Sequence, residues 1–259
     1  MCFERSARPP LPPIAGGAGV RTDRFQLTAA DGNRFSCFRA VSEDPGGPGI
    51  VVMPDVRGLH PFYEELAVRF GSVGVHATAI DYFGRTAGTA PRTEEFDHMA
   101  HVQQTEPETI AQDVAAAVAH IRSEEGGAAS SVFTVGFCFG GRASFNQAAR
   151  SHELAGVIGF YGFVGRRDAS DTEAPVVLAP RYECPVLGLF GGADQHITQE
   201  HIRAFGSALD EAGVPSELET YEGAPHSFFD RAFDQFRDES ADAWRRMLSF
   251  TERYGSTVR

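Results

Sequence analysis

Residues 134–141 read Thr-Val-Gly-Phe-Cys-Phe-Gly-Gly, which places Cys138 between Gly136 and Gly140. An apolar run ends just before this cysteine and a helical pattern begins just after it, so Cys138 occupies a sharp strand-to-helix turn. Glycines two residues to either side leave room for such a turn, and the first N–H groups of the helix favour a thiolate. The stretch predicts that Cys138 is a nucleophile and that the N–H of Phe139 stabilises an oxyanion. A buried cysteine in a glycine-rich turn is the alternative interpretation.

Short apolar runs and helical patterns alternate on both sides of this stretch. We expect strands at 49–54, 75–80, 132–135, 154–161, 186–190 and 217–221, and helices at 62–70, 107–122, from about 139, 199–212 and 239–254. Nearly all-apolar strands separated by helices indicate an α/β fold with a mostly parallel central sheet and helices on both faces. Thr105 and Glu108 predict a capping box at the start of the 107–122 helix.

The N-terminal part of the chain has a different pattern. Residues 24–29 and 34–40 alternate apolar and polar side chains around Asp31-Gly32-Asn33, which indicates an antiparallel hairpin. Residues 1–22 are rich in proline and glycine and predict an extended lead. A length of 259 residues fits one large domain spanning residues 1–259.

An acid and a histidine follow two later strands. Asp194 ends the turn Gly191-Gly192-Ala193-Asp194 after the 186–190 strand, and His226 lies in the loop after the 217–221 strand. Functional groups of parallel sheets gather at these carboxyl ends, and the chain order of nucleophile, acid and base fits a catalytic triad. We therefore expect His226 to be the base and Asp194 its orienting acid. The alternatives are a turn former or helix cap for Asp194 and an exposed loop histidine for His226.

Composition argues against several classes of function. Twenty-three basic against 35 acidic residues give a net charge of -12, which disfavours nucleic acid and anionic membrane as partners. The sequence shows neither a membrane-spanning apolar run nor a secretory h-region. The four cysteines are far apart and read as reduced thiols, so we expect a cytoplasmic protein, as a monomer or small homo-oligomer. Neither a recurrent metal-ligand spacing nor a dinucleotide fingerprint is present, so we expect no metal and no cofactor.

From about residue 23 to 255 the sequence resembles the dienelactone hydrolase family of α/β-hydrolases. Four further stretches carry the resemblance besides the cysteine turn: Val51-Val52-Met53-Pro54-Asp55-Val56-Arg57-Gly58-Leu59, Ala79-Ile80-Asp81-Tyr82-Phe83-Gly84-Arg85, Phe190-Gly191-Gly192-Ala193-Asp194 and Tyr221-Glu222-Gly223-Ala224-Pro225-His226-Ser227-Phe228. The resemblance implies an α/β-hydrolase fold and a catalytic triad of Cys138, His226 and Asp194. It also implies that the N–H of Val56 joins that of Phe139 in the oxyanion hole.

The resemblance extends to residues that surround the nucleophile. Family members carry an acid, usually Glu, at the position of Asp55, where it contacts the resting thiol. Arg85 matches an arginine that binds the substrate carboxylate, and Tyr82 lies in the same motif. A second such arginine is expected four residues after the histidine, where this chain has Asp230 and then Arg231. Arg57 follows a strand end beside the oxyanion loop and is a further candidate for contact with substrate.

Two functions from different classes compete. The first is a carboxylic ester hydrolase, similar to carboxymethylenebutenolidases, that cleaves a small carboxylate-bearing lactone or ester through an acyl-enzyme. The second is a non-catalytic ligand-binding or thiol-sensing protein of the same fold. Two structural questions stay open as well: Arg85 could instead pair with Asp81 or with Glu94 and Glu95, and residues 84–105 could form either a lid or a connecting loop.

Overall fold

The computed structural model describes residues 7–13, 19–44, 46–93 and 95–255. Much of the expected N-terminal lead, together with Cys2 and Glu94, lies outside these residues. One sheet contains eight strands in the order β1-β2-β4-β3-β5-β6-β7-β8. Their bounds are β1 Val20–Thr28, β2 Arg34–Ser42, β3 Gly49–Met53, β4 His76–Ile80, β5 Val132–Phe137, β6 Gly156–Phe160, β7 Val186–Gly191 and β8 Ser216–Tyr221.

The sheet is mixed, with its antiparallel part confined to the N-terminal hairpin. β1 and β2 pair antiparallel from Val20 opposite Ser42 to Thr28 opposite Arg34, and β2 pairs antiparallel with β4. All the other neighbouring strands are parallel. The α/β fold with a mostly parallel sheet and an N-terminal hairpin is therefore confirmed.

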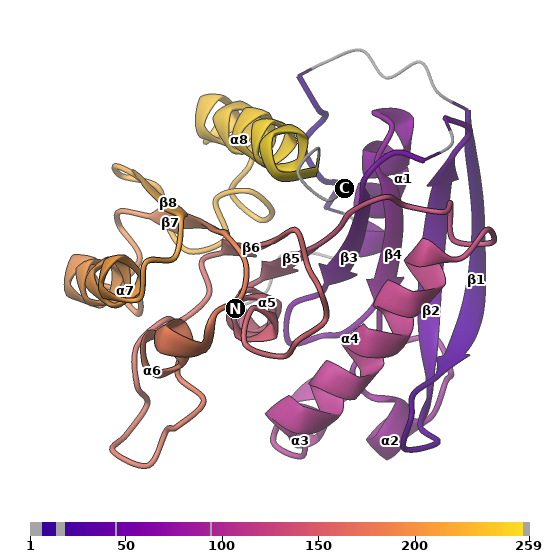
Figure 1. The fold of residues 1–259 in the computed structure, drawn as a ribbon, viewed down its shortest axis with the longest axis horizontal. Helices are drawn as coiled ribbons and strands as arrows, with labels where there is room; N and C mark the ends of the chain where they lie inside the picture. The colour runs from indigo at the N-terminus through magenta and orange to yellow at the C-terminus, as the bar shows by residue number, and fades with distance from the viewer. Residues whose placement is uncertain (1–6, 14–18, 45, 94, 256–259) are drawn as a thin grey trace.

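Helices cover both faces of this sheet (Figure 1). The helices are α1 Pro61–Ser72, α2 Gly84–Ala87, α3 His98–Val102, α4 Pro107–Arg122, α5 Phe139–Gln147, α6 Pro175–Leu178, a 3-10 turn at Ala179–Arg181, α7 Gln199–Glu211 and α8 Arg237–Gly255. In β3, Ile50 and Val52 belong to the core cluster that contains apolar residues of α1 and α8. The alternate residues Val51 and Met53 belong to the cluster formed with α4. This alternation in a strand buried on both sides is why β3 reads as a continuous apolar run.

Two local expectations change in the structure. The predicted capping box at α4 is wrong, because Glu106 is the N-cap and the Thr105 hydroxyl donates instead to the carbonyl of Val102 at 2.7 Å. A capping box occurs at α7, where the Thr198 side chain accepts the backbone N–H of His201 and the His201 side chain accepts the backbone N–H of Thr198. The 84–105 segment contains the helices α2 and α3. These helices are too short to show a hydrophobic period in the sequence.

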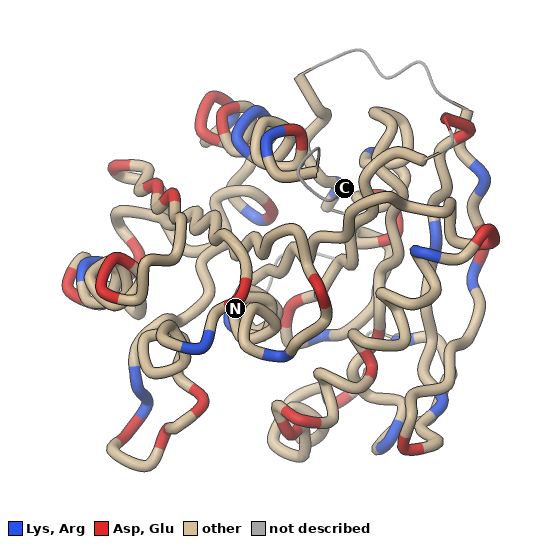
Figure 2. Tube along the Cα trace, viewed as in Figure 1, with Lys and Arg blue, Asp and Glu red and all other residues tan. Residues whose placement is uncertain are grey.

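The carboxyl ends of the parallel strands bring separate parts of the chain together. Asp55 follows β3, Asp81 follows β4, Cys138 follows β5, Asp194 follows β7 and His226 follows β8. We call this side of the sheet the carboxyl edge. Acidic and basic residues are interspersed along the trace (Figure 2). No helix in the described part of the chain is long and apolar enough to span a bilayer.

Candidate active site

Cys138 occupies a strained backbone conformation between β5 and α5. Its φ of 56° and ψ of -111° are rare for a residue with a side chain. Its N–H donates to the carbonyl of Phe160 at 3.0 Å, and its side chain is partly exposed. A Cβ at Gly136 would overlap the carbonyl of Gly140, and a Cβ at Gly140 would overlap the carbonyls of Met53 and Pro54. These two overlaps explain why the cysteine turn needs both glycines.

His226 and Asp194 form a hydrogen-bonded pair. His226 Nδ1 lies 2.6 Å from Asp194 Oδ2, and the Asp194 side chain is almost fully buried. The other oxygen of Asp194 accepts the N–H groups of His196 at 2.8 Å and Ile197 at 3.2 Å. Asp194 is thus both a turn-forming residue and the partner of the histidine, so the two interpretations of this acid are compatible.

The same histidine lies close enough to Cys138 for the thiol to affect its pKa. Burial lowers the pKa of His226, but hydrogen bonds to Asp194 and Cys138, together with the charges of both groups, outweigh burial and raise the pKa to about 10. These contacts therefore favour the protonated form of His226, which is the form that results when the imidazole takes a proton from the thiol. The structure thus pairs His226 with Asp194 and places this pair near Cys138.

Two backbone N–H groups at the carboxyl edge lack an acceptor in the described part of the chain. Phe139 is the first residue of α5, where helical N–H groups lack an acceptor within the helix. Val56 follows the end of β3, and among the described residues neither its N–H nor that of Phe139 has an acceptor. Val56 and Phe139 can therefore both donate to a ligand oxygen.

Asp55 lies in a buried ion pair with Arg57. Asp55 Oδ1 accepts the backbone N–H of Arg57 at 2.8 Å, and Asp55 Oδ2 accepts from Arg57 Nη2 at 2.9 Å. The same guanidinium nitrogen lies 3.1 Å from His60 Nε2. The expected contact between Asp55 and the resting thiol stays a prediction, as does contact between Arg57 and substrate.

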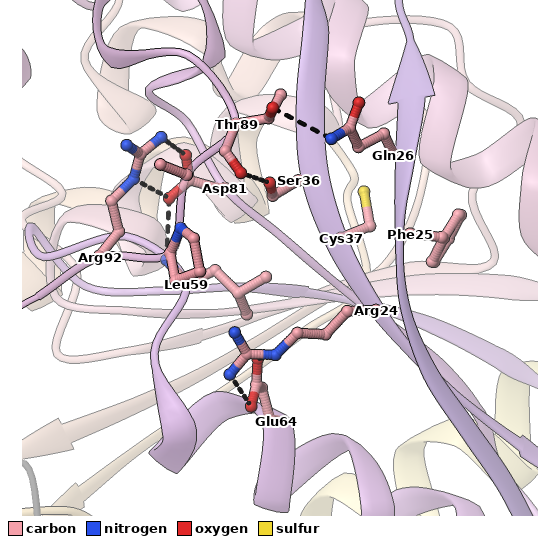
Figure 3. Close-up of a pocket in the computed structure, with 12 residues that line it drawn as sticks. Arg24, Phe25, Gln26, Ser36, Cys37, Leu59, Glu64, Asp81, Thr89 and Arg92 are labelled. Carbon is pink, nitrogen blue, oxygen red and sulfur yellow. Dashed lines mark hydrogen bonds and ion pairs between the residues drawn. The ribbon is translucent and has the colours of Figure 1, made fainter.

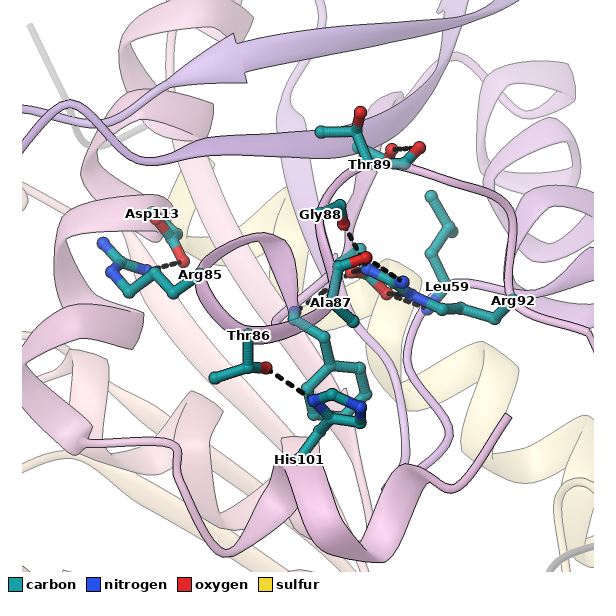
Figure 4. A network of polar contacts seen from close by, with 12 residues as sticks. Leu59, Arg85, Thr86, Ala87, Gly88, Thr89, Arg92, His101 and Asp113 are labelled. Carbon is teal, nitrogen blue, oxygen red and sulfur yellow. Dashed lines mark hydrogen bonds and ion pairs between the residues drawn. The ribbon is translucent and has the colours of Figure 1, made fainter. Parts of the chain in front are cut away.

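Arg85 has two carboxylate partners. The alternative pairing with Asp81 is wrong, because Asp81 is held by Arg92 at 2.6 Å (Figure 3). Arg85 instead contacts Asp113 of α4 at 2.6 Å (Figure 4) and Asp31 of the β1–β2 turn at 2.7 Å. To bind a substrate carboxylate, Arg85 would have to exchange one of these acids for the substrate.

The two remaining expected substrate-binding residues lie in different surroundings. The buried Tyr82 donates its hydroxyl to the carbonyl of Pro54 at 2.8 Å, and its ring lies edge-on to that of Phe139 at 5.3 Å. Arg231 is exposed, and its backbone N–H donates to the Asp230 carboxylate. Their roles in binding substrate stay predictions.

A buried acid beside His226 is absent from the sequence predictions. Asp230 accepts the hydroxyl of Tyr161 at 2.6 Å, and the ring of Tyr161 lies 4.9 Å from that of His226. Burial raises the pKa of Asp230 to about 7, although hydrogen bonds from Tyr161 and Arg231 oppose the shift. The only sequence signal for this group is an acid directly after Ser227-Phe228-Phe229, at the position where the resembled family has arginine.

A groove runs along α5 from the residue that follows the nucleophile. This α5 groove has a volume of 450 Å³. Its apolar lining residues are Val102, Pro107, Ile110, Phe139 and Ala143. Its polar lining residues are Gln103, Thr105, Arg142, Asn146, Gln147, Arg167, Ser170, Asp171, Thr172 and Glu173. A smaller cavity of 210 Å³ lies between the N-terminal hairpin and residues 89–92 (Figure 3). Within the described ranges, no three His, Cys, Asp or Glu side chains are placed to hold a metal ion.

Comparisons with known proteins agree with this architecture. The model of the dienelactone hydrolase family matches residues 35–255. The carboxymethylenebutenolidase of Rhodococcus opacus is 27% identical over 259 residues, covering 98% of this chain and 97% of the relative. A dienelactone hydrolase-like promiscuous phosphotriesterase from metagenomic libraries has a TM-score of 0.74 at 23% identity, covering 92% of this chain and 99% of that chain. The acylaminoacyl peptidase of Pyrococcus horikoshii has a TM-score of 0.72 at 13% identity, covering 91% of this chain and 42% of that chain.

The sheet order and the cysteine turn at its carboxyl edge define an α/β-hydrolase. The family match covers most of the chain, including every strand from β3 to β8. The chain belongs to the dienelactone hydrolase family and is a carboxylic ester hydrolase.

Proposed function

We propose that the protein cleaves a small lactone or ester through an acyl-enzyme on Cys138, with His226 as base and Asp194 as orienting acid. One observation carries this proposal: His226, whose Nδ1 lies 2.6 Å from the buried carboxylate of Asp194, is also close enough to the strained Cys138 for the thiol to raise its pKa. Nucleophile, base and orienting group in this order make up a working triad.

The steps of the reaction follow from these contacts. His226 takes the thiol proton, and Cys138 Sγ attacks the carbonyl carbon of the substrate. The N–H groups of Val56 and Phe139 hold the resulting oxyanion. The carbon–oxygen bond to the leaving group then breaks, and the leaving oxygen takes the proton from His226. Water gives a proton to His226 and attacks the thioester, which releases the acid and restores Cys138.

The substrate class rests on relatives and on the α5 groove. The name of the Rhodococcus opacus relative refers to an unsaturated lactone, whose leaving group stays attached when the ring opens. Phe139, the residue after the nucleophile, lines the α5 groove together with the apolar side chains of Val102, Pro107, Ile110 and Ala143, so the groove can receive the part of an ester that lies beyond the reacting carbonyl. Preference for a carboxylate-bearing substrate stays a prediction. Arg85, the arginine expected to bind that carboxylate, already pairs with Asp31 and Asp113.

Replacing the nucleophile tests the proposal directly. In Cys138→Ala we expect turnover of small lactones and p-nitrophenyl esters to fall by about a thousandfold or more, with loss of the acyl-enzyme burst. Cys184→Ala is the matched control, since this buried thiol lies in the core and should keep wild-type turnover. Wild-type turnover in Cys138→Ala would overturn the proposal.

The non-catalytic alternative predicts a different result for the wild-type protein. A ligand-binding or thiol-sensing protein would still react with iodoacetamide at Cys138, and a bound ligand would protect it. It would show neither a burst nor steady turnover with any ester. Measurement of both phases in stopped-flow therefore separates the two functions.

A further inference from the structure

The loop that follows β3 is held by side-chain contacts on both sides of Val56. We propose that Asp55 and Arg57 are positioning residues, which fix the Val56 N–H in the oxyanion hole by clamping the peptide chain around it. This proposal rests on the proposed function, because it assigns the clamp to the same reaction. It differs from the role that the family resemblance implies for Asp55, which is contact with the thiol.

The clamp closes over one residue. Asp55 Oδ1 accepts the backbone N–H of Arg57 at 2.8 Å, so the carboxylate bridges the chain across Val56. The guanidinium of Arg57 returns to the same carboxylate, with Nε 3.3 Å from Oδ1 and Nη2 2.9 Å from Oδ2. The N–H of Gly58 donates to the carbonyl of Asp55 at 3.1 Å. Val56 therefore lies inside a turn closed by backbone and side chain together, while its own N–H stays available.

Further contacts fix both ends of the turn. Before it, the N–H of Asp55 donates to the hydroxyl of Tyr63 at 3.1 Å, and Tyr82 donates to the carbonyl of Pro54 at 2.8 Å. After it, the N–H of Leu59 donates to Asp81 at 3.0 Å, and Asp81 is itself held by Arg92 (Figure 3). The turn is thus tied to α1, to β4 and to the 84–105 segment, so the position of Val56 depends on the surrounding fold.

Burial makes this clamp rigid. Asp55 is 3% exposed and Arg57 is 7% exposed, so solvent screens their attraction little. Removal of one partner leaves the other charge buried without compensation. Both oxygens of Asp55 are engaged by Arg57, so under the proposed function this carboxylate acts on the oxyanion by holding the peptide at Val56. An oxyanion donor has to hold its position within about 0.5 Å to act fully.

The test compares reactions that use the oxyanion hole with one that does not. Turnover of p-nitrophenyl acetate uses it, and so does inhibition by a trifluoromethyl ketone, because thiol addition to the ketone carbon creates an oxyanion. Alkylation of Cys138 by iodoacetamide displaces iodide and forms no oxyanion. Asp55→Asn keeps an acceptor for the Arg57 N–H, whereas Asp55→Ala removes it. Asp242→Asn is the control, since the carboxylate of Asp242 on α8 also pairs with an arginine, Arg246, and accepts the hydroxyl of Tyr221.

We expect Asp55→Ala to lower kcat by roughly ten- to a hundredfold, short of the full loss of an oxyanion donor. Asp55→Asn should lose less, KM should change little, and the inhibition constant of the ketone should rise in step with the loss of kcat. The alkylation rate should stay within about twofold of wild type, and the control should match wild type in every assay. Should Asp55→Ala not fold, Arg57→Gln is the second variant, with the same expectations.

Two results would overturn the clamp. An alkylation rate that falls in proportion to kcat would show that Asp55 acts on the thiol. An unchanged kcat and ketone affinity in a folded Asp55→Ala would show that the loop holds Val56 without the pair. Failure of the proposed function is distinguishable from both, because Cys138→Ala would then keep its turnover.

Discussion

The backbone of Cys138 shows how a single residue couples the fold to the chemistry. A positive φ at a non-glycine residue costs about 1–3 kcal/mol, and the Cys138 N–H bond to Phe160 helps to offset this cost. The turn brings the sulfur to the carboxyl edge and starts α5 directly behind it. The strain is thus a consequence of placing a side chain where β5 ends and α5 begins.

Asp194 and His226 are expected to act as one unit. Asp194→Asn and His226→Ala should each lower kcat by about a hundredfold or more, because Asp194 reaches the reaction only through its 2.6 Å contact with His226. The double variant should be no worse than His226→Ala by more than about threefold. The measurement is a double-mutant cycle: kcat for one ester in wild type, in the two single variants and in the double variant. Fully additive losses would mean that Asp194 serves only the turn at residues 196–197.

Asp230 should make stability depend on pH. Its pKa is about 7 in the folded protein and near 3.8, the ordinary value of an aspartate, when the chain is unfolded, so between these pH values the folded state holds a proton that the unfolded state has lost. Stability should therefore fall as pH rises from about 4 to about 7, by a total on the order of 4 kcal/mol. Asp230→Asn has no charge to bury and should lack this fall.

Urea unfolding of wild type and Asp230→Asn at several pH values measures the effect. His226 does not obscure it, because a raised histidine pKa contributes stability that is lost only between about pH 6.5 and 10. If the stability difference between the two proteins does not change between about pH 4 and pH 7, the pKa of Asp230 is not raised by folding and the prediction is wrong.

At the scale of elements, hydrophobic pattern predicts the long units and misses the short ones. The helix expected at 107–122 has these bounds in the structure, and the strand expected at 186–190 extends one residue further. Four-residue helices such as α2 and α6 contain too few turns to show a period. The predicted capping box is absent because the Thr105 hydroxyl donates to the carbonyl of Val102, a local side-chain-to-backbone bond that competes with capping.

In the candidate site, too, some features could be predicted from the sequence and others could not. The positions of Cys138, Asp194 and His226 at the carboxyl edge could be predicted, because each follows a recognisable strand and the topology brings these strand ends together. Partners of charged side chains could not be predicted, since they depend on the packing of remote segments. Arg85 meets Asp31 and Asp113, and Tyr161 meets Asp230, although tens of residues separate the partners of each pair.

The contacts of Arg85 give it an anchoring role between α2, the hairpin and α4. Asp113 is buried, so Arg85→Gln would leave its carboxylate without a charged partner. We expect this variant to unfold at a temperature several degrees lower, for a loss of about 1–3 kcal/mol. The ratio of kcat/KM for a carboxylate-bearing ester over its neutral methyl-capped analogue should stay within about twofold of wild type. A collapse of this ratio would instead make Arg85 the anion site that the family resemblance implies.

Across the whole molecule, charge sets how an anionic substrate approaches. The net charge is -12, and Figure 2 shows acidic residues on α7, β8 and α8 as well as near the hairpin. Arg57, Arg85, Arg92 and Arg142 each have a carboxylate within salt-bridge distance. The field near these four arginines is therefore largely neutralised, while the long-range field stays negative.

This balance predicts the sign of the salt dependence. Raising NaCl from about 10 mM to about 300 mM shortens the screening length to less than about 10 Å. The kcat/KM of a carboxylate-bearing ester should then rise roughly twofold, because the repulsion that opposes its approach is screened. The neutral methyl-capped analogue is the control and should not respond. A fall of kcat/KM with salt for the charged ester alone would contradict the prediction, since it would show that an uncompensated cation near Cys138 outweighs the field of the whole molecule.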